Sequence, residues 1–261
     1  MYRPPLTGKI SNPTKLMCQS CGRPLLQHPP IYSRRGFLKL VGGAGAALAL
    51  PGQALFAAGE TPKPQNVLTP HEALLRLKKG NERYVNGVMK RHDFLSERAA
   101  LAGGQNPFAG ILSCADSRVA PEYAFDSGRG DLFVVRVAGN FLNEDALASF
   151  EYTIKFLGTT LLVVLGHDKC GAVDAAIKTV KDGAELPGHL PGLVEHIRPA
   201  VKTAMAEQGD LLANAIRENV LLNVENLKTA TPLISRYVTE DKVHVVGGIY
   251  KLDDGRIEWL T

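Results

Sequence analysis

The sequence predicts an α/β domain with a mostly parallel central sheet of four to five strands flanked by helices. Short apolar runs alternate along the chain with longer segments of helical periodicity, which is the pattern of a parallel sheet covered by helices on both faces. The runs at residues 132–137 and 160–165 are also rich in Val and Leu and do not alternate with polar residues. This composition is typical of strands that are buried on both faces.

The domain is expected to open with a helix that begins at Pro70. Thr69 precedes it as the N-cap, Pro70 takes the first helical position, and Glu72 follows three residues after the cap. Together they form a capping box. Apolar and small residues then recur at helical spacing as far as Tyr84, and Gly87 can end the helix.

Strands and helices follow in alternation. The expected strands are residues 108–113, 132–137, 160–165 and 243–246, with a short final strand at 256–260. The expected helices are residues 121–125, 144–157, 171–181, 193–206 and 211–229. Because no repeat or low-complexity segment interrupts this series, residues 59–261 are predicted to form a single domain.

Residues 1–58 are predicted to be a leader and not part of the fold. Residues 33–39 read Ser-Arg-Arg-Gly-Phe-Leu-Lys, a twin-arginine signature, and a Gly/Ala-rich apolar run follows as far as Pro51. That run is shorter than the about 20 residues that a membrane-spanning helix needs, so no stable membrane span is expected. We therefore expect recognition by the Tat export machinery, removal of the leader, and a periplasmic or secreted protein that is exported already folded.

Two cysteines, Cys18 and Cys21, lie ahead of the twin arginine. They could be half of a zinc knuckle, although a second cysteine pair is absent. They could instead be a redox pair, although no βαβ context follows. The sequence favours a remnant without function in the mature protein, and Met17 could be the true start.

The positive charge of the chain is confined to the leader. The chain has 30 basic and 26 acidic residues, and residues 1–58 hold seven of the basic ones and no acidic ones. Residues 59–261 are therefore slightly acidic, which gives no electrostatic reason to expect a nucleic acid as partner. Four cysteines are also too few for a disulfide scaffold in a chain of 261 residues.

Two of the expected strands end next to residues that commonly bind zinc. Cys114 follows the strand at 108–113, and His167 and Cys170 follow the strand at 160–165. In sheets of this kind, ligands bind beyond the carboxyl ends of the strands, so the three side chains can meet if the two strands are neighbours. Three protein ligands leave one coordination position open, as in a catalytic zinc site. Each half alone has an alternative: Cys114 could be a small buried residue of the core, and residues 166–171 could be an ordinary loop.

The residues around these ligands resemble the β-class carbonic anhydrases. The resemblance rests on Cys-x-Asp-x-Arg at residues 114–118 followed by His-x-x-Cys at 167–170, and on Asp-Leu-Phe-Val-Val-Arg-Val-Ala-Gly-Asn at 131–140. It extends from residue 68 to residue 250. It implies the β-carbonic anhydrase fold, one Zn²⁺ per subunit on the three ligands, and reversible hydration of carbon dioxide to bicarbonate by a zinc-bound hydroxide. It also implies a homodimer or a larger homo-oligomer.

The resemblance also implies roles for individual residues. Asp116 and Arg118 would form a catalytic dyad, in which Arg118 keeps the pKa of Asp116 low by its opposite charge. A further set would bind carbon dioxide or bicarbonate, partly from the adjacent subunit: Gln105, Phe133, Tyr152 and Gly171.

Ile111 is a departure from the family pattern. Some members have a Trp there, as part of an inhibitory bicarbonate site. We therefore expect an open site at neutral pH, with Asp116 as a conditional fourth metal ligand at low pH. Two alternatives to carbon dioxide hydration stay open: hydrolysis of carbonyl sulfide or carbon disulfide on the same scaffold, and a non-catalytic zinc-binding protein. An intact Asp116 and Arg118 argue against the second.

Overall fold

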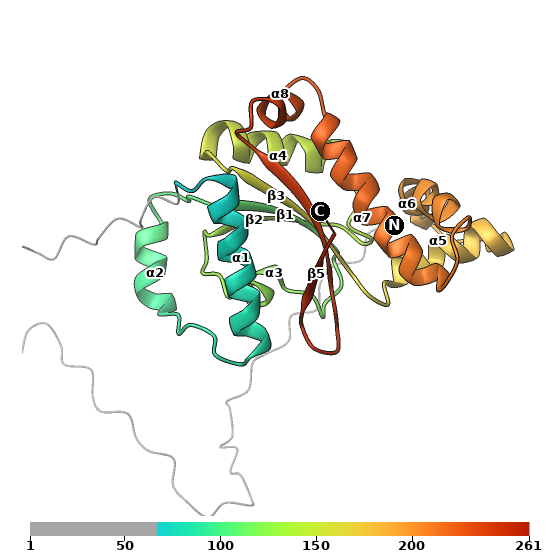
Figure 1. Cartoon of the computed structure of the whole chain (residues 1–261), viewed down its shortest axis with the longest axis horizontal. Coiled ribbons are helices and arrows are strands. Elements are labelled where there is room, and N and C mark those ends of the chain that lie inside the picture. Colours follow the sequence, from blue (N-terminus) through green and yellow to red (C-terminus); the bar gives the residue numbers. More distant parts are fainter. Residues whose placement is uncertain (1–66, 261) are drawn as a thin grey trace, which may run out of the picture. The chain divides into compact units, whose positions relative to one another are not determined.

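The computed structural model describes residues 67–260, and within them a five-stranded sheet has the order β2-β1-β3-β4-β5 (Figure 1). The first four strands are parallel, and β5 pairs antiparallel with β4. This confirms the predicted α/β fold class. The strands are β1 (Ala109–Ser113), β2 (Leu132–Arg136), β3 (Leu161–His167), β4 (His244–Tyr250) and β5 (Ile257–Trp259).

The predicted leader lies outside the described residues, as do Cys18 and Cys21, and the domain division at residue 58 stays a prediction. Within residues 67–260, no helix is long and apolar enough to cross a membrane. The helices are α1 (Pro70–Val85), α2 (Phe94–Leu101), α3 (Pro121–Ala124), α4 (Glu144–Leu157), α5 (Gly171–Asp182), α6 (Leu190–Ala204), α7 (Leu211–Thr229) and α8 (Ile234–Thr239).

Helices cover both faces of the sheet, and strand β3 shows how the core is divided. Leu161, Val163 and Leu165 pack on one face with residues of α1 and α3. Leu162 and Val164 point to the other face, where α4, α5, α6, α7 and α8 contribute to a second apolar cluster. Because successive side chains of a strand point to opposite faces, a central strand covered on both sides must be apolar throughout.

Local capping interactions set several helix ends. The Thr69 hydroxyl accepts a hydrogen bond from the backbone N–H of Glu72, whose carboxylate accepts one from the backbone N–H of Thr69, so the predicted capping box is present. Asn143 caps α4 and Asp210 caps α7, each by accepting a hydrogen bond from the backbone N–H three residues further on. These side chains satisfy backbone N–H groups that have no partner within the helix.

Strand β2 differs from its prediction. The sequence indicated a strand buried on both faces, but β2 lies at the edge of the sheet, and Phe133, Val134 and Val135 are only half-buried. A continuous apolar run does not distinguish a central strand from an edge strand whose apolar surface is left uncovered within one chain. Among the described residues, no strand pairs with the outer edge of β2, and its apolar side chains are left partly exposed.

Candidate metal centre

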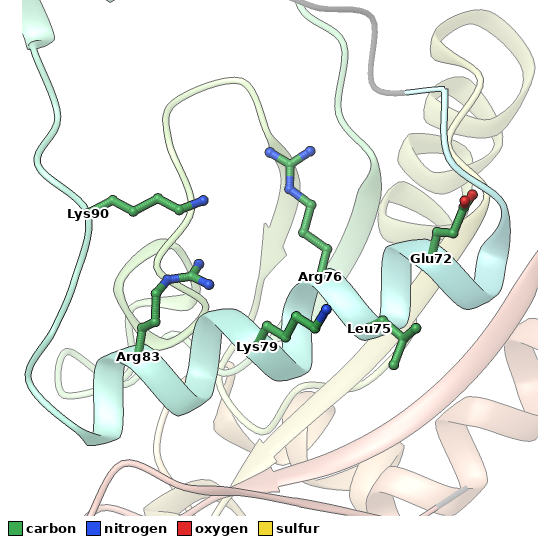
Figure 2. A pocket seen from close by; sticks show the side chains of 6 residues that line it. All are labelled: Glu72, Leu75, Arg76, Lys79, Arg83 and Lys90. Atoms are coloured by element: carbon green, nitrogen blue, oxygen red, sulfur yellow. The ribbon is translucent and has the colours of Figure 1, made fainter.

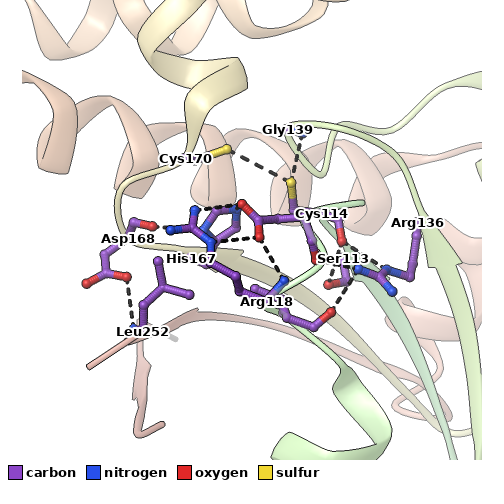
Figure 3. Close-up of polar contacts among 11 residues, drawn as sticks. Ser113, Cys114, Arg118, Arg136, Gly139, His167, Asp168, Cys170 and Leu252 are labelled. Carbon is purple, nitrogen blue, oxygen red and sulfur yellow. Dashed lines mark hydrogen bonds and ion pairs between the residues drawn. The ribbon is translucent and has the colours of Figure 1, made fainter. Parts of the chain in front are cut away.

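The carboxyl ends of β1 and β3 place three soft or borderline donor groups together. β1 and β3 are neighbours in register, with Ser113 opposite Leu165. Cys114 follows β1, His167 is the last residue of β3, and Cys170 directly precedes α5. Their ligand atoms all lie within 4.8 Å of one another, and the two sulfur atoms are 4.0 Å apart (Figure 3). All three side chains are buried, so this cluster could hold a metal ion.

The orientation of His167 is fixed by the backbone. Its Nδ1 donates a hydrogen bond to the carbonyl of Asp168 at 2.8 Å. Asp168 is itself tied to the end of β4, because its N–H donates to Tyr250 and its carboxylate accepts from the N–H of Leu252. This leaves Nε2 of His167 buried and without a hydrogen-bond partner among the described residues. A neutral imidazole held in this way presents its lone pair to a cation.

The contact between the two cysteine sulfurs moves their pKa values in opposite directions. Contact with Cys170 lowers the pKa of Cys114 to about 4, with further help from His167 and from the backbone N–H of Gly139, which lies 3.3 Å from the sulfur. The same contact with Cys114, together with burial, raises the pKa of Cys170. A bound cation would relieve the repulsion between two thiolates, which is why metal binding to such a pair releases protons.

Asp116 and Arg118 form a bidentate pair beside the cluster. The Arg118 guanidinium donates to both carboxylate oxygens of Asp116, at 3.0 and 2.7 Å, and the Arg118 backbone N–H donates to one of them at 2.9 Å. These hydrogen bonds hold the pKa of Asp116 well below its usual range. One oxygen of Asp116 lies 3.8 Å from Nε2 of His167. An ionised carboxylate is therefore next to the position that a metal would occupy.

Arg136, at the end of β2, holds the loop that carries these residues, and the sequence reasoning did not single it out. Its guanidinium donates to the backbone carbonyls of Cys114, Asp116 and Val119 at 2.7 to 3.0 Å. Arg136 is directly opposite Ser113 in the sheet, beside the last residue of β1. A lone charged residue at the end of an otherwise apolar strand was the signal that could have revealed it.

The structure does not bring every predicted site residue to this cluster. Gly171 is the first residue of α5, next to Cys170. Gln105 is exposed and precedes β1, whereas Cys114 follows it, so a strand of five residues at roughly 3.3 Å per residue separates them. Phe133 is opposite Gly110, three positions before the end of β1, and its ring lies 6.4 Å from that of the half-exposed Tyr152.

A separate pocket lies along α1 and is rich in basic side chains (Figure 2). Two of its arginines face buried carboxylates, since Arg76 pairs with Asp131 and Arg83 with Asp126. These pairs tie α1 to the segment between α3 and β2. The lining residues are Glu72, Leu75, Arg76, Lys79, Arg83 and Lys90.

Comparison with known proteins agrees with this geometry. The family model described as carbonic anhydrase matches residues 109–257, which is more than half of the chain and includes all three ligands of the cluster. The chain belongs to the carbonic anhydrase family. Carbonic anhydrase 2 of Mycobacterium tuberculosis is 40% identical over 188 residues, covering 72% of this chain and 91% of that protein. The carbonic anhydrase of Mycolicibacterium smegmatis is 36% identical over 194 residues, covering 72% and 92%.

Solved structures place the chain in the β class of carbonic anhydrases. The structure of the β-carbonic anhydrase CcaA superimposes with a TM-score of 0.54 at 29% identity, covering 72% of this chain and 95% of that one. A Coccomyxa β-carbonic anhydrase, solved in complex with acetazolamide, has a TM-score of 0.57 at 23% identity and shares the fold. The family that the sequence resembled is thus confirmed.

Proposed function

We propose that this β-class carbonic anhydrase holds one Zn²⁺ between Cys114, His167 and Cys170 and catalyses the reversible hydration of carbon dioxide to bicarbonate and a proton. The observation that carries the proposal is the buried cluster of two sulfurs and one imidazole nitrogen with an ionised carboxylate beside it. Zinc suits this donor set, and three protein ligands are the number found in catalytic zinc sites.

A zinc ion at this cluster would supply a Lewis acid that makes water a nucleophile at neutral pH. Side chains of the protein would orient the water and its proton acceptor. Asp116 would accept a hydrogen bond from the attacking water and so direct a lone pair at the carbon of carbon dioxide. Arg118 would keep Asp116 ionised and fix both of its oxygens through the bidentate contact.

We further propose that the site is open at neutral pH. The bidentate contact with Arg118 holds the Asp116 carboxylate in place, so any movement of Asp116 towards a metal would work against these hydrogen bonds. Ile111 supports the same proposal. Its side chain is fully buried and packs in the apolar cluster on the side of α1 and α3, where it offers no polar group to a bicarbonate ion.

Stopped-flow measurement of carbon dioxide hydration on zinc-loaded protein tests the proposal. We expect the protein to be active and Asp116→Asn to lose roughly 10²-fold or more in kcat/KM, the range for a group that handles a proton in the transition state. The zinc content of the variant must equal that of the wild type. Full activity in Asp116→Asn would contradict the role of the dyad, and turnover of carbonyl sulfide or carbon disulfide instead of carbon dioxide would change the substrate.

We also propose that the active form is a homodimer or a larger homo-oligomer. The half-buried Phe133 of the edge strand β2 lies next to two exposed aromatic side chains of α4: the rings of Phe133 and Tyr152 lie 6.4 Å apart, and those of Tyr152 and Phe156 lie 5.4 Å apart. Phe156 is 72% exposed. A cluster of this kind is a common feature of surfaces that pack against a partner. It also supports the proposal that Gln105, Phe133 and Tyr152 serve the site of an adjacent subunit.

Mixing two inactive variants tests the shared site. In a mixed dimer of Gln105→Ala and Asp116→Asn subunits, one site would combine the intact Asp116 of one subunit with the intact Gln105 of the other. Activity should then rise above that of either variant alone. If both residues of a site come from the same subunit, no site in the mixture is intact and activity does not rise.

The leader is proposed to export the folded protein through the Tat pathway. Cys114 and Cys170 support this route, because an unfolded chain reaching an oxidising compartment could pair these cysteines before a metal binds. A reporter fused to residues 1–60 should leave the cytoplasm, and Arg34→Lys combined with Arg35→Lys should retain it. A reporter that is still exported after the double substitution would contradict the proposal.

A further inference from the structure

A buried chain of hydrogen bonds connects helix α7 to the sulfur of Cys114. The backbone N–H of Gly139 donates to the Cys114 sulfur at 3.3 Å (Figure 3). The carbonyl of the same residue accepts a hydrogen bond from Nδ2 of Asn219 at 2.8 Å. Gly139 thus links the Cys114 sulfur, through its N–H, to the Asn219 side chain on α7, through its carbonyl.

The far end of that segment is held by a second asparagine. Oδ1 of Asn223 accepts a hydrogen bond from the N–H of Leu142 at 2.7 Å. Its Nδ2 donates to the carbonyl of Asn219 at 2.7 Å, which joins the two asparagines one helical turn apart. Asn219 is 1% exposed and Asn223 is 2% exposed. Buried amides are costly unless their hydrogen bonds are made, and here the partners include the backbone of residues 139–142.

The loop at residues 139–142 needs such support because its backbone is unusual. Gly139 has φ +85° and the next residue, Asn140, has φ +40°. A Cβ on Gly139 would lie 2.5 Å from Cδ1 of Ile197 and 3.3 Å from Cβ of Ala172, so the loop is also pressed against α6 and the start of α5. A positive φ is ordinary for glycine, but it is unfavourable for a residue with a side chain such as Asn140, so this part of the loop depends on its surroundings.

We propose that Asn219, assisted by Asn223, is a positioning residue of the metal centre. By holding the Gly139 carbonyl, Asn219 keeps the Gly139 N–H directed at the Cys114 sulfur. A hydrogen bond to a ligating sulfur withdraws electron density from it, and groups behind the ligands commonly change metal affinity 10- to 100-fold. The inference rests on the proposed metal site and adds residues of α7, far along the chain, to its control.

The experiment compares Asn219→Leu with a matched variant, Asn81→Leu. Asn81 is also a buried asparagine: its Nδ2 donates to the carbonyls of Ala124 and Gly255, and its Oδ1 accepts from the N–H of Ile257. It belongs to α1, which covers the opposite face of the sheet from α7. Both substitutions remove buried hydrogen bonds to backbone, so both are expected to lower the urea midpoint.

Metal binding should separate the two variants. Zinc affinity, measured by competition with a chromophoric chelator, should fall 10- to 100-fold in Asn219→Leu and stay within about twofold of wild type in Asn81→Leu. In cobalt-loaded protein, the absorption band that arises from charge transfer between thiolate and cobalt should shift only in Asn219→Leu. Asn219→Ser, a smaller change at the same position, is measured in parallel and provides the result if the Leu variant does not fold.

Two results would overturn the inference. One is a zinc affinity and a cobalt spectrum in the Asn219 variants equal to those of wild type. The other is an equal effect of Asn81→Leu, which would make the role of Asn219 merely structural. A wild-type protein that binds zinc weakly and gives no thiolate–cobalt band would instead refute the proposed metal site, and this inference with it.

Discussion

Gly80, in α1, is the glycine between residues 67 and 260 where an added methyl group would lie closest to other backbone atoms. A Cβ built there would overlap the carbonyl oxygen of Phe125 and lie 2.7 Å from its carbonyl carbon. Carbon atoms in contact prefer about 3.5–4.0 Å, so α1 would have to move away by roughly 1 Å. The obstacle is backbone at the end of α3, and no change of side-chain rotamer can remove it.

The expected cost of Gly80→Ala follows from the contacts around it. Overpacking against a rigid neighbour costs about 1–3 kcal/mol or more. The movement would also strain the hydrogen bonds from Asn81 to Ala124 and Gly255, each with a net value of about 1 kcal/mol. Against this, alanine is a better helix former than glycine by about 1 kcal/mol. The net loss should be about 2–4 kcal/mol.

Urea unfolding followed by circular dichroism measures this loss. With a slope of about 2–3 kcal/mol per molar urea, the midpoint should fall by about 1 M. Gly192→Ala is the matched control, because Gly192 also lies within a helix, α6, and a Cβ there meets nothing within 4 Å. That variant should be as stable as the wild type or slightly more stable. Equal midpoints for the two variants would refute the reasoning.

Three further outcomes are expected. Arg118→Leu should raise the pKa of Asp116 towards its ordinary value. NMR titration of the Asp116 carboxyl carbon should show this as a midpoint at higher pH than in the wild type, and an unmoved midpoint would contradict the pairing. Treatment with a zinc chelator should lower the temperature of unfolding, because a cation that binds Cys114 and Cys170 only in the native state stabilises that state by mass action. Added zinc should restore the unfolding temperature. An unfolding temperature that does not change with the chelator would argue against a bound metal. Phe150→Ala should destabilise the protein by about 3–5 kcal/mol, because this fully buried ring packs in the apolar cluster that includes residues of α4 and α7. A loss of less than about 1 kcal/mol in urea unfolding would contradict that packing.

Features encoded by neighbouring residues were predicted well. The bounds expected for α4 and α7 are those observed, because Asn143 and Asp210 cap these helices locally and Gly158 ends α4 in a left-handed conformation. Helices α2 and α8 were not predicted, since eight and six residues are too few to show a helical period.

Features that depend on distant pairing could not be predicted to the same extent. The Cys-His-Cys cluster could be expected from the sequence because each ligand lies at the end of a parallel strand or just beyond it, so only the adjacency of β1 and β3 had to be assumed. The edge position of β2 depends on the order of all five strands. The role of Asn219 depends on a contact with a residue 80 positions away, and a buried asparagine within an amphipathic helix gives no sign of its partner.

Arg136 allows some residues beside the cluster to be replaced without moving the backbone. Its guanidinium binds three backbone carbonyls of the segment from Cys114 to Val119, so the path of that segment depends little on the side chains it carries. Ala115 and Ser117 within it are exposed. Replacing these two residues can therefore change the size and polarity of the surface next to Cys114 and Asp116 while the backbone that carries the cluster keeps its path.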